Sequence, residues 1–376
     1  MVQRPHPLVI FIACLVLLTG AYSGWWMFLA SGLRDSAQTW IAEWRAQGHE
    51  AAYGDLEVGG FPFALRLRLN DASYTLNPDG EGWAWRGGDM AVTLRPWDPG
   101  HLEFSLGGVH RFTYTSGDGG WHTATLRMDE AGDAEGMVGL DGAGLPWAGF
   151  LDAEGLEVTP REGAPTVTLR RFHFDLRKRP PSEAVEEDDE TTEEGGETVM
   201  GAISSMIPAH ETAFLRVAFI LEGLRLPEEA ARPFGPEIEL VQGRIDLMGA
   251  PPRGPAREAA EAWRDSGGTV ELAGFALRWD GLDISGDGTL ALDGELQPTG
   301  AMTLSARGFV TVIDTLVARG VIRPGPAATT RTILGLMAKT PEEGGAPVLK
   351  APLTVQKRRL FVGPVRLAEL PAIAWE

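Results

Sequence analysis

The chain opens with a long apolar segment. Residues 8–30 carry no charged side chain, and they lie between Arg4 and Arg34. As an α-helix they would be roughly 35 Å long, enough to cross a hydrocarbon core of about 30 Å. The pattern predicts a membrane anchor over residues 1–30, with Trp25 and Trp26 at the level of the lipid headgroups.

A removable signal peptide is the alternative, because the strongly hydrophobic part ends at Leu18 and Thr19-Gly20-Ala21 resembles a cleavage site. Arg4 predicts a cytoplasmic tail by the positive-inside tendency, so we expect the residues after Ala30 to be exported. The expected localisation is the inner membrane, single-pass, with the bulk in the periplasm. If the segment is cleaved, a soluble periplasmic protein is expected.

A helical pattern follows the apolar segment. Apolar residues recur at helical spacing from Leu33 to Trp44, with Ser31 as the predicted N-cap and Gly48 as the stop. Trp40 and Trp44 would pack on a sheet or, alternatively, lie along the membrane surface.

Beyond Gly48 the hydrophobic period changes from helical to two, which is typical of strands with one buried face. Two such strands are joined at Gly60, Phe61, Pro62 and Phe63, which we interpret as a structural corner with both rings in the core. A knob that docks a partner is the alternative. The alternation is seen in Leu56 and Val58, in Leu65, Leu67 and Leu69, in Val92 and Leu94, in Leu102, Phe104 and Leu106, and from Val167 to Leu176.

The second half contains the clearest meander, over residues 270–304. Its predicted hairpin turns are Asp280-Gly281, Asp287-Gly288 and Asp293-Gly294. Helices are expected over residues 255–263, 309–320 and 333–337. The predicted class is mainly β (β-rich α+β), with antiparallel meanders that form long curved sheets and a few packing helices, after an N-terminal transmembrane helix.

An acidic run divides these two regions. Residues 183–197 include nine acidic side chains in fifteen, which repel one another and favour disorder. The predicted organisation is therefore a helix plus β-rich half over residues 31–182, an acidic disordered linker over 183–198, and a β-meander with helices over 199–376.

Composition excludes several classes of protein. The net charge of -19 argues against nucleic acid as a partner, because binding requires basic residues that neutralise phosphates. The single cysteine, Cys14, excludes a disulfide framework and a thiolate metal site, and it lies inside the apolar segment.

No motif in the sequence carries recognisable catalytic chemistry. A Gly-x-Ser-x-Gly elbow, metal-ligand spacing of histidines and a phosphate-binding glycine loop are all missing from the sequence. We therefore expect no enzyme, and no catalytic, cofactor-binding or metal residue. The candidates weighed against this are three strand histidines, predicted to be half-exposed, and three predicted turn aspartates: His110, His122, His173, Asp280, Asp283 and Asp287.

Four local motifs follow one another along the chain: Trp25-Trp26, Gly60-Phe61-Pro62-Phe63, Gly267-Gly268 followed by Gly286, Gly288 and Gly300, and Val362-Gly363-Pro364. In this order they resemble an alphaproteobacterial envelope family of unknown function, domain of unknown function 2125. The resemblance implies an envelope protein and supplies no activity. The layout also resembles, more remotely, the AsmA-like envelope proteins, whose long sheets curl into apolar grooves implicated in lipid traffic.

The expected function is that of a non-catalytic, membrane-anchored periplasmic protein that binds an apolar ligand or lipid or assists envelope biogenesis. The alternatives are an envelope scaffold or protein-interaction module, and a hydrolase with an unrecognised site. Expected partners are the inner membrane through the N-terminal helix, a lipid or apolar ligand, and other envelope proteins, without a cofactor.

Overall fold

The computed structural model describes residues 7–76, 82–115, 120–128, 134–142, 145–178, 213–231, 234–252, 254–320, 323–339, 346–362 and 365–375. Its antiparallel strands confirm the predicted mainly β class. The acidic segment 183–198 lies outside the described residues. Two compact units are distinguished: unit 1 comprises Met1–Pro146 and Ala153–Thr166, and unit 2 comprises Trp147–Asp152 and Val167–Glu376.

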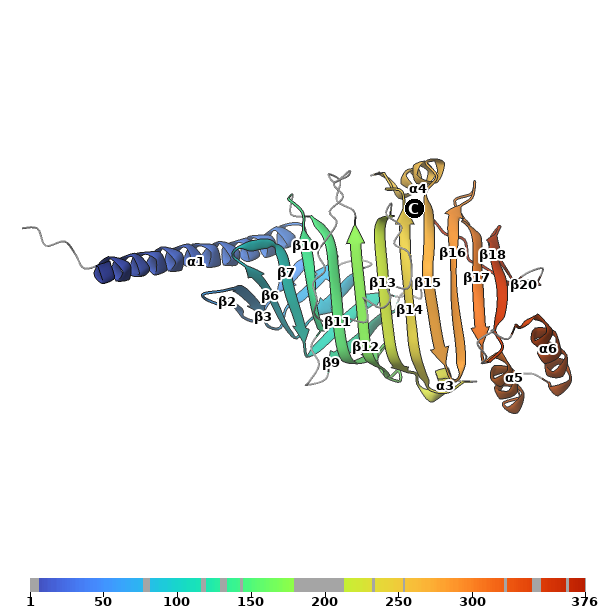
Figure 1. Cartoon of the computed structure of the whole chain (residues 1–376). Helices are drawn as coiled ribbons and strands as arrows, with labels where there is room; N and C mark the ends of the chain where they lie inside the picture. The colour runs from blue at the N-terminus through green and yellow to red at the C-terminus, as the bar shows by residue number, and fades with distance from the viewer. Residues whose placement is uncertain are drawn as a thin grey trace, which may run out of the picture. The chain divides into compact units, whose positions relative to one another are not determined.

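Unit 1 begins with one unbroken helix, α1 (Pro7–Ala46), shown as a single rod in Figure 1. The prediction of a separate helix that starts at Ser31 is wrong, because the Ser31 hydroxyl donates to the carbonyl of Phe28 inside the helix instead of capping a new one. The lone Gly32 costs a helix only about 1 kcal/mol relative to alanine and does not interrupt it. Gly48, at φ +87°, follows the helix end as predicted.

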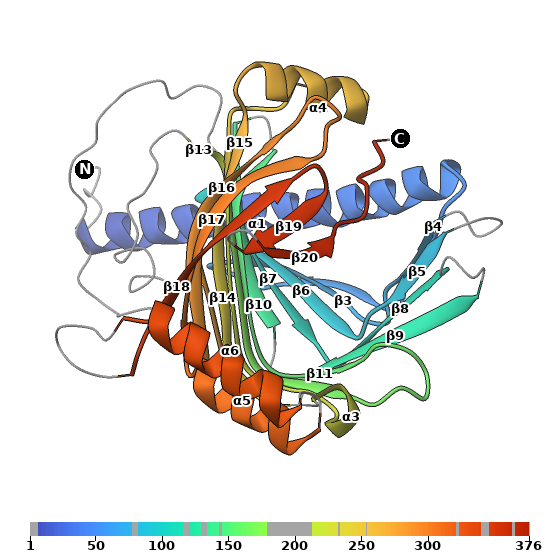
Figure 2. The same cartoon turned by 90° about the vertical axis from the view of Figure 1, so that its right-hand side faces the viewer.

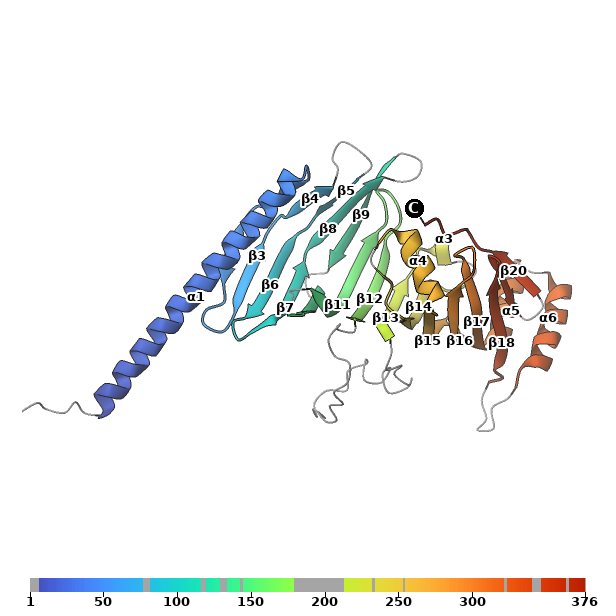
Figure 3. The same ribbon diagram turned by 90° about the horizontal axis from the view of Figure 1, so that it is seen from above.

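The remainder of unit 1 consists of two antiparallel ladders. One runs in the order β2, β3, β6, β7, β10, and the other in the order β1, β4, β5, β8, β9, β11. Figure 3 shows α1 alongside β3 and β4. The strands are β1 (Glu50–Ala52), β2 (Leu56–Gly59), β3 (Leu65–Leu69), β4 (Ser73–Leu76), β5 (Trp83–Arg86), β6 (Asp89–Arg95), β7 (Asp98–Gly107), β8 (Val109–Thr115), β9 (Trp121–Met128), β10 (Ala134–Leu140) and β11 (Pro146–Thr159), the last of which contributes residues to both units.

Aromatic contacts hold the end of α1 against the second ladder. The Trp44 ring lies 5.0 Å from the Tyr74 ring of β4, and Trp40 stacks on Trp44 at 4.5 Å. Packing on the sheet is therefore confirmed for Trp44, whereas Trp40 remains 60% exposed.

Unit 2 is a meander in which each strand pairs with the next along the chain. Its strands are β12 (Val167–Lys178), β13 (Ala213–Arg225), β14 (Glu237–Met248), β15 (Thr269–Trp279), β16 (Leu282–Leu292), β17 (Pro298–Arg307), β18 (Leu349–Gln356), β19 (Arg359–Val362) and β20 (Val365–Glu369).

Helices lie at the two ends of the unit 2 strands. The helix α4 (Ala256–Asp265) joins β14 to β15 at one end, while α3 (Glu228–Ala231), α5 (Phe309–Ala318) and α6 (Pro324–Met337) follow strands that finish at the other (Figure 1). The helices α5 and α6 pack against each other (Figure 2). In α4, the Trp263 indole donates to the carbonyls of Met248 and Gly249, at 2.9 and 3.0 Å, and its ring occupies the space where a side chain at Gly268 would stand.

One predicted turn is wrong. Asp287-Gly288 lies inside β16, so the two strands expected on either side of it are a single strand. A Cβ at Gly288 would stand 2.2 Å from the Met302 side chain of β17, so this glycine admits a neighbouring side chain and does not turn the chain. Asp280-Gly281, with φ values of 50° and 78°, does form the β15–β16 turn.

Candidate functional site

The central part of one face of the unit 2 sheet consists of apolar residues and glycine. Strand register places directly paired residues on the same face, and three rows cross seven strands without a polar residue. We call these rows the apolar face of unit 2: Phe172, Leu221, Val241, Leu277, Ile284, Ala306 and Leu349; Phe174, Phe219, Gly243, Phe275, Gly286, Leu304 and Ala351; Leu176, Val217, Ile245, Leu272, Gly288, Met302 and Leu353.

Large side chains in this face lie over glycines of the neighbouring strand. A Cβ at Gly243 would meet the Phe219 ring at 2.8 Å, and one at Gly286 would meet the Leu304 side chain at 2.6 Å. The larger side chains therefore lie over the glycines of the neighbouring strand, and they project less far from the sheet than they otherwise would. Most side chains of the face stay half-buried.

The opposite face of the same strands is polar, yet it contains the most deeply buried side chain of the unit. Asp246 is 0% exposed and accepts hydrogen bonds from Arg216 at 2.8 and 3.3 Å. Arg244, 4% exposed, lies 3.9 Å from the same carboxylate, and burial lowers its pKa although the negative charge of Asp246 raises it. Unit 2 thus buries paired charges on one face and leaves its aliphatic and aromatic side chains partly open on the other.

Unit 1 has a comparable apolar face on its first ladder. Two rows of paired residues cross β2, β3, β6, β7 and β10 there, a third crosses β3, β6, β7 and β10, and the residues of β6 and β7 are half-buried. We call this set the apolar face of unit 1: Leu56, Leu69, Met90, Leu106 and Ala134; Val58, Leu67, Val92, Phe104 and Gly136; Leu65, Leu94, Leu102 and Val138.

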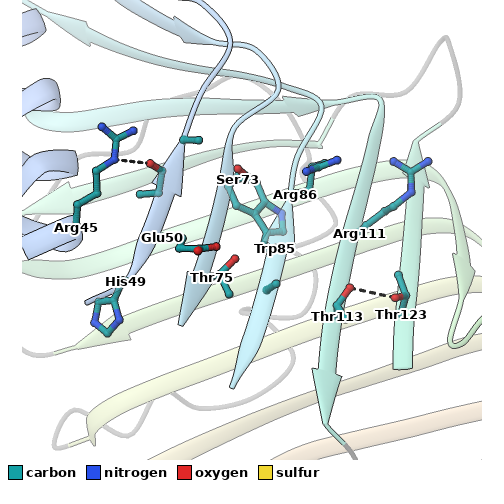
Figure 4. Close-up of a pocket in the computed structure, with 13 residues that line it drawn as sticks. Arg45, His49, Glu50, Ser73, Thr75, Trp85, Arg86, Arg111, Thr113 and Thr123 are labelled. Atoms are coloured by element: carbon teal, nitrogen blue, oxygen red, sulfur yellow. Dashed lines mark hydrogen bonds between the residues drawn. The ribbon is translucent and has the colours of Figure 1, made fainter. Parts of the chain in front are cut away.

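The second ladder of unit 1 carries a hollow of about 640 Å³ that both polar and apolar side chains line (Figure 4). Arg86 of β5 stands directly opposite Arg111 of β8, and Arg45 from α1 donates from Nε to the carbonyl of Ala51 at 2.7 Å. Glu50 is the carboxylate among its lining residues. The hydroxyls of Thr113 and Thr123, 3.0 Å apart, line the same hollow.

The corner at residues 60–63 joins β2 to β3 as predicted, but its rings are not in the core. Phe61 is 52% exposed and Phe63 is 71% exposed, so the interpretation that both rings are buried is wrong. The corner packs on α1 instead: the Tyr22 hydroxyl donates to the carbonyl of Pro62, and the Trp26 indole donates to that of Ala64 at 2.9 Å.

The two tryptophans predicted at the membrane interface differ in their surroundings. Trp26 is 9% exposed and lies edge-on to Phe61, with 5.4 Å between ring centroids, whereas Trp25 is 44% exposed. Within the described residues, α1 is the helix long and apolar enough to cross a membrane, as an anchor or as a signal segment would be.

The histidines weighed as catalytic candidates stand apart from one another along the strands. His110 and His173 are 2% and 7% exposed, so the prediction that they are half-exposed is wrong for both. His173 Nδ1 lies 2.7 Å from Asp152, and the Nε2 atoms of both buried histidines have no hydrogen-bond partner among the described residues. No cluster of three metal-ligating side chains occurs in the part of the chain that the structure describes.

The three aspartates that were predicted to lie in turns do not form a cluster either. Asp280 lies in the β15–β16 turn and accepts from the Gly235 amide at 3.1 Å, while Asp283 and Asp287 lie within β16, which corrects their assignment as turn residues. Asp283 pairs with Arg307 at 3.7 Å. Asp280 and Asp283 therefore each connect neighbouring parts of the chain, while Asp287 is exposed.

Sequence comparison identifies a family. A family model described as an uncharacterized protein conserved in bacteria (DUF2125) matches residues 26–371, nearly the whole chain. No curated protein and no solved structure matches the chain. The resemblance to AsmA-like proteins accordingly stays a prediction.

Proposed function

The chain belongs to DUF2125, a family conserved in bacteria, and on that premise we propose that it is a single-pass membrane protein of the envelope that binds an apolar ligand of lipid type without catalysing a reaction. In this proposal α1 crosses the inner membrane from the cytoplasm, and the two units lie in the periplasm. Arg4 on the cytoplasmic side of the apolar segment supports this orientation.

The observation that carries the proposal is the half-open apolar face of unit 2. Soluble proteins rarely leave contiguous apolar patches of more than a few hundred Å² uncovered unless the patch binds something. Three rows across seven strands, with glycines that lower the surface under Phe219 and Leu304, give a long and smooth apolar surface. Acyl chains suit such a surface, because each buried methylene group contributes about 0.8 kcal/mol.

The polar face of unit 2 supports the same assignment from the other side. Arg216 donates to Asp246 and Arg244 lies 3.9 Å from the same carboxylate, and strand alternation directs these charges away from the apolar face. The apolar rows therefore present no charge that an acyl chain would have to desolvate.

The experiment is native mass spectrometry with lipid analysis on the full chain, extracted in a mild detergent. Ile284→Asp introduces a carboxylate into the apolar face, and Ser285→Asp introduces the same group one residue along β16, on the opposite face. We expect copurified phospholipid in the unaltered chain and in Ser285→Asp, and a loss of at least about ten-fold in Ile284→Asp, since a charge on an apolar surface costs several kcal/mol.

Equal lipid in both variants, with unaltered melting temperatures, would place the lipid elsewhere on the protein. A lipid-free chain in every sample would contradict the proposal and favour the alternative of an envelope scaffold, for which crosslinking in the envelope would then identify the partners.

A further inference from the structure

The corner of residues 60–64 is fastened to α1 at a defined height along the helix. The Tyr22 hydroxyl and the Trp26 indole donate to the carbonyls of Pro62 and Ala64. These donors are four residues apart and so lie on the same side of the helix, about 6 Å apart along its axis. Two hydrogen bonds and the contact between Phe61 and Trp26 therefore fix the height of the corner relative to α1.

The corner presents apolar side chains away from these contacts. Phe63 is 71% exposed and Phe61 is 52% exposed. The eight residues 58–65 around them carry no charge, and the first charged side chains on either side are Glu57 and Arg66. Exposed rings in an uncharged turn suit the interface of a bilayer, where aromatic side chains are enriched.

The sequence of α1 sets where the bilayer boundary meets the helix. A hydrocarbon core of about 30 Å takes roughly 20 helical residues, which, counted from the start of α1 at Pro7, extend to Trp26. Met27 and Phe28, directly beyond it, are 68% and 73% exposed. The outer interface therefore falls at the turn of α1 to which the corner is bonded.

We propose that the β2–β3 corner inserts Phe61 and Phe63 into the outer interface of the bilayer that α1 crosses, as a second point of membrane contact. The lipid surface is its partner. This inference rests on the proposed function, because the height of the corner is set by a membrane-spanning α1.

The insertion gives the apolar face of unit 1 an entrance. Val58 and Leu65 belong to that face and flank the corner directly. Leu65 and Leu67 are themselves buried, at 2% and 8% exposed, and the side chains of this face that stay half-buried next to them are their β6 partners Leu94 and Val92. The corner thus links the membrane to the ladder β2, β3, β6, β7, β10.

The test uses the full chain with Cys14→Ser, so that one new cysteine carries an environment-sensitive NBD fluorophore. Phe63→Cys and, separately, Phe61→Cys place the fluorophore at the corner. Trp121→Cys is the matched control, since Trp121 is 52% exposed at the start of β9, in the second ladder of the same unit and away from the corner. The protein is reconstituted in vesicles of phosphatidylcholine and phosphatidylglycerol that contain a lipid with a nitroxide high on its acyl chain.

We expect the nitroxide to quench the corner fluorophores about two-fold or more and to leave position 121 bright, because quenching needs contact at the interfacial depth. Carbonate extraction of the same vesicles reports separately whether α1 anchors the chain. A chain that resists extraction while its corner fluorophores stay bright overturns the insertion and leaves the anchor intact.

The converse result, extraction of the chain together with a quenched corner, would retain the insertion and remove the proposed anchor. Bright corner fluorophores on an extractable chain would contradict both. The melting temperature of Phe63→Cys should match that of the Cys14→Ser background, because the Phe63 ring is exposed, whereas Phe61→Cys also loses the contact with Trp26 and should melt at a lower temperature.

Discussion

The two faces of the unit 2 sheet differ in what they bury. On the polar face, Asp246 is fully inaccessible beside Arg244, whereas on the apolar face residues such as Leu277 and Ile284 stay half-open. In most globular proteins the assignment is the reverse, with charges exposed and aliphatic side chains inside. The difference teaches that the apolar face is not packed as an ordinary core is, which is the basis for our proposal that it binds a ligand.

The largest expected effect comes from breaking the buried charge cluster. Asp246→Ala should destabilise the protein by about 3–5 kcal/mol, because Arg244 and Arg216 then lose their shared carboxylate in a buried site. Urea unfolding of the full chain measures the change. Asp287→Ala, on the same face but exposed, should stay within about 0.5 kcal/mol. If both substitutions changed the free energy of unfolding equally, the buried charge cluster would contribute no more to stability than an exposed aspartate does.

The next effect compares one residue type on opposite faces. Leu169 is 7% exposed and belongs to the polar side of β12, while Leu277 is half-buried in the apolar face. Leu169→Ala should cost about 2–4 kcal/mol through the cavity it leaves, and Leu277→Ala only about 1 kcal/mol in lipid-free protein. A cost for Leu277→Ala as large as that for Leu169→Ala would identify the apolar face as a packed core and remove the comparison.

The smallest expected effect on stability concerns unit 1, where a polar side chain, His110, occupies a buried position. His110 stacks on Trp85 with 6.0 Å between ring centroids; burial lowers its pKa, and its hydrogen bond with the Gly107 backbone partly offsets this. The unfolded chain therefore binds this proton more readily, so the stability that His110 contributes is complete above about pH 6.5 and is lost as the pH falls below it.

His110→Phe keeps an aromatic ring against Trp85 and removes the titration. Between about pH 7.5 and pH 5.5, the free energy of unfolding in urea should fall less for this variant than for the unaltered chain. For one proton, the difference between the two is at most ~1.4 kcal/mol per pH unit. Identical pH dependence in the two proteins would show that other groups govern acid sensitivity.

Much of the fold follows from local pattern. Period-two alternation placed strands such as β3, β7 and β12 correctly, because one face of each ladder is apolar and the other polar. The glycines of β16 could not be interpreted in the same way. Asp287-Gly288 has the composition of a turn, and the contact of Gly288 with Met302 on the next strand is a tertiary fact.

The candidate site was harder to predict than the fold. Register between seven strands turns scattered alternations into continuous apolar rows, and register depends on turns and bulges that sequence patterns do not determine. Phe61 and Phe63 have the hydrophobicity of core residues, so the local pattern could not reveal that α1 would occupy their inner side and leave the rings outside. The uncharged stretch from residue 58 to 65, beside a membrane segment, was the signal that could have suggested it.

The continuity of α1 from Pro7 to Ala46 has a mechanical meaning. An unbroken helix tilts as one rigid body. A change of tilt in its apolar part would therefore rotate Trp44 by the same angle, and with it the Tyr74 side of β4 that Trp44 contacts. In the proposed topology, a change in bilayer thickness that tilts α1 would therefore also move the ladders of unit 1. A thicker membrane would draw the corner at Phe61 and Phe63 closer to the lipid, and a thinner one would lift it out.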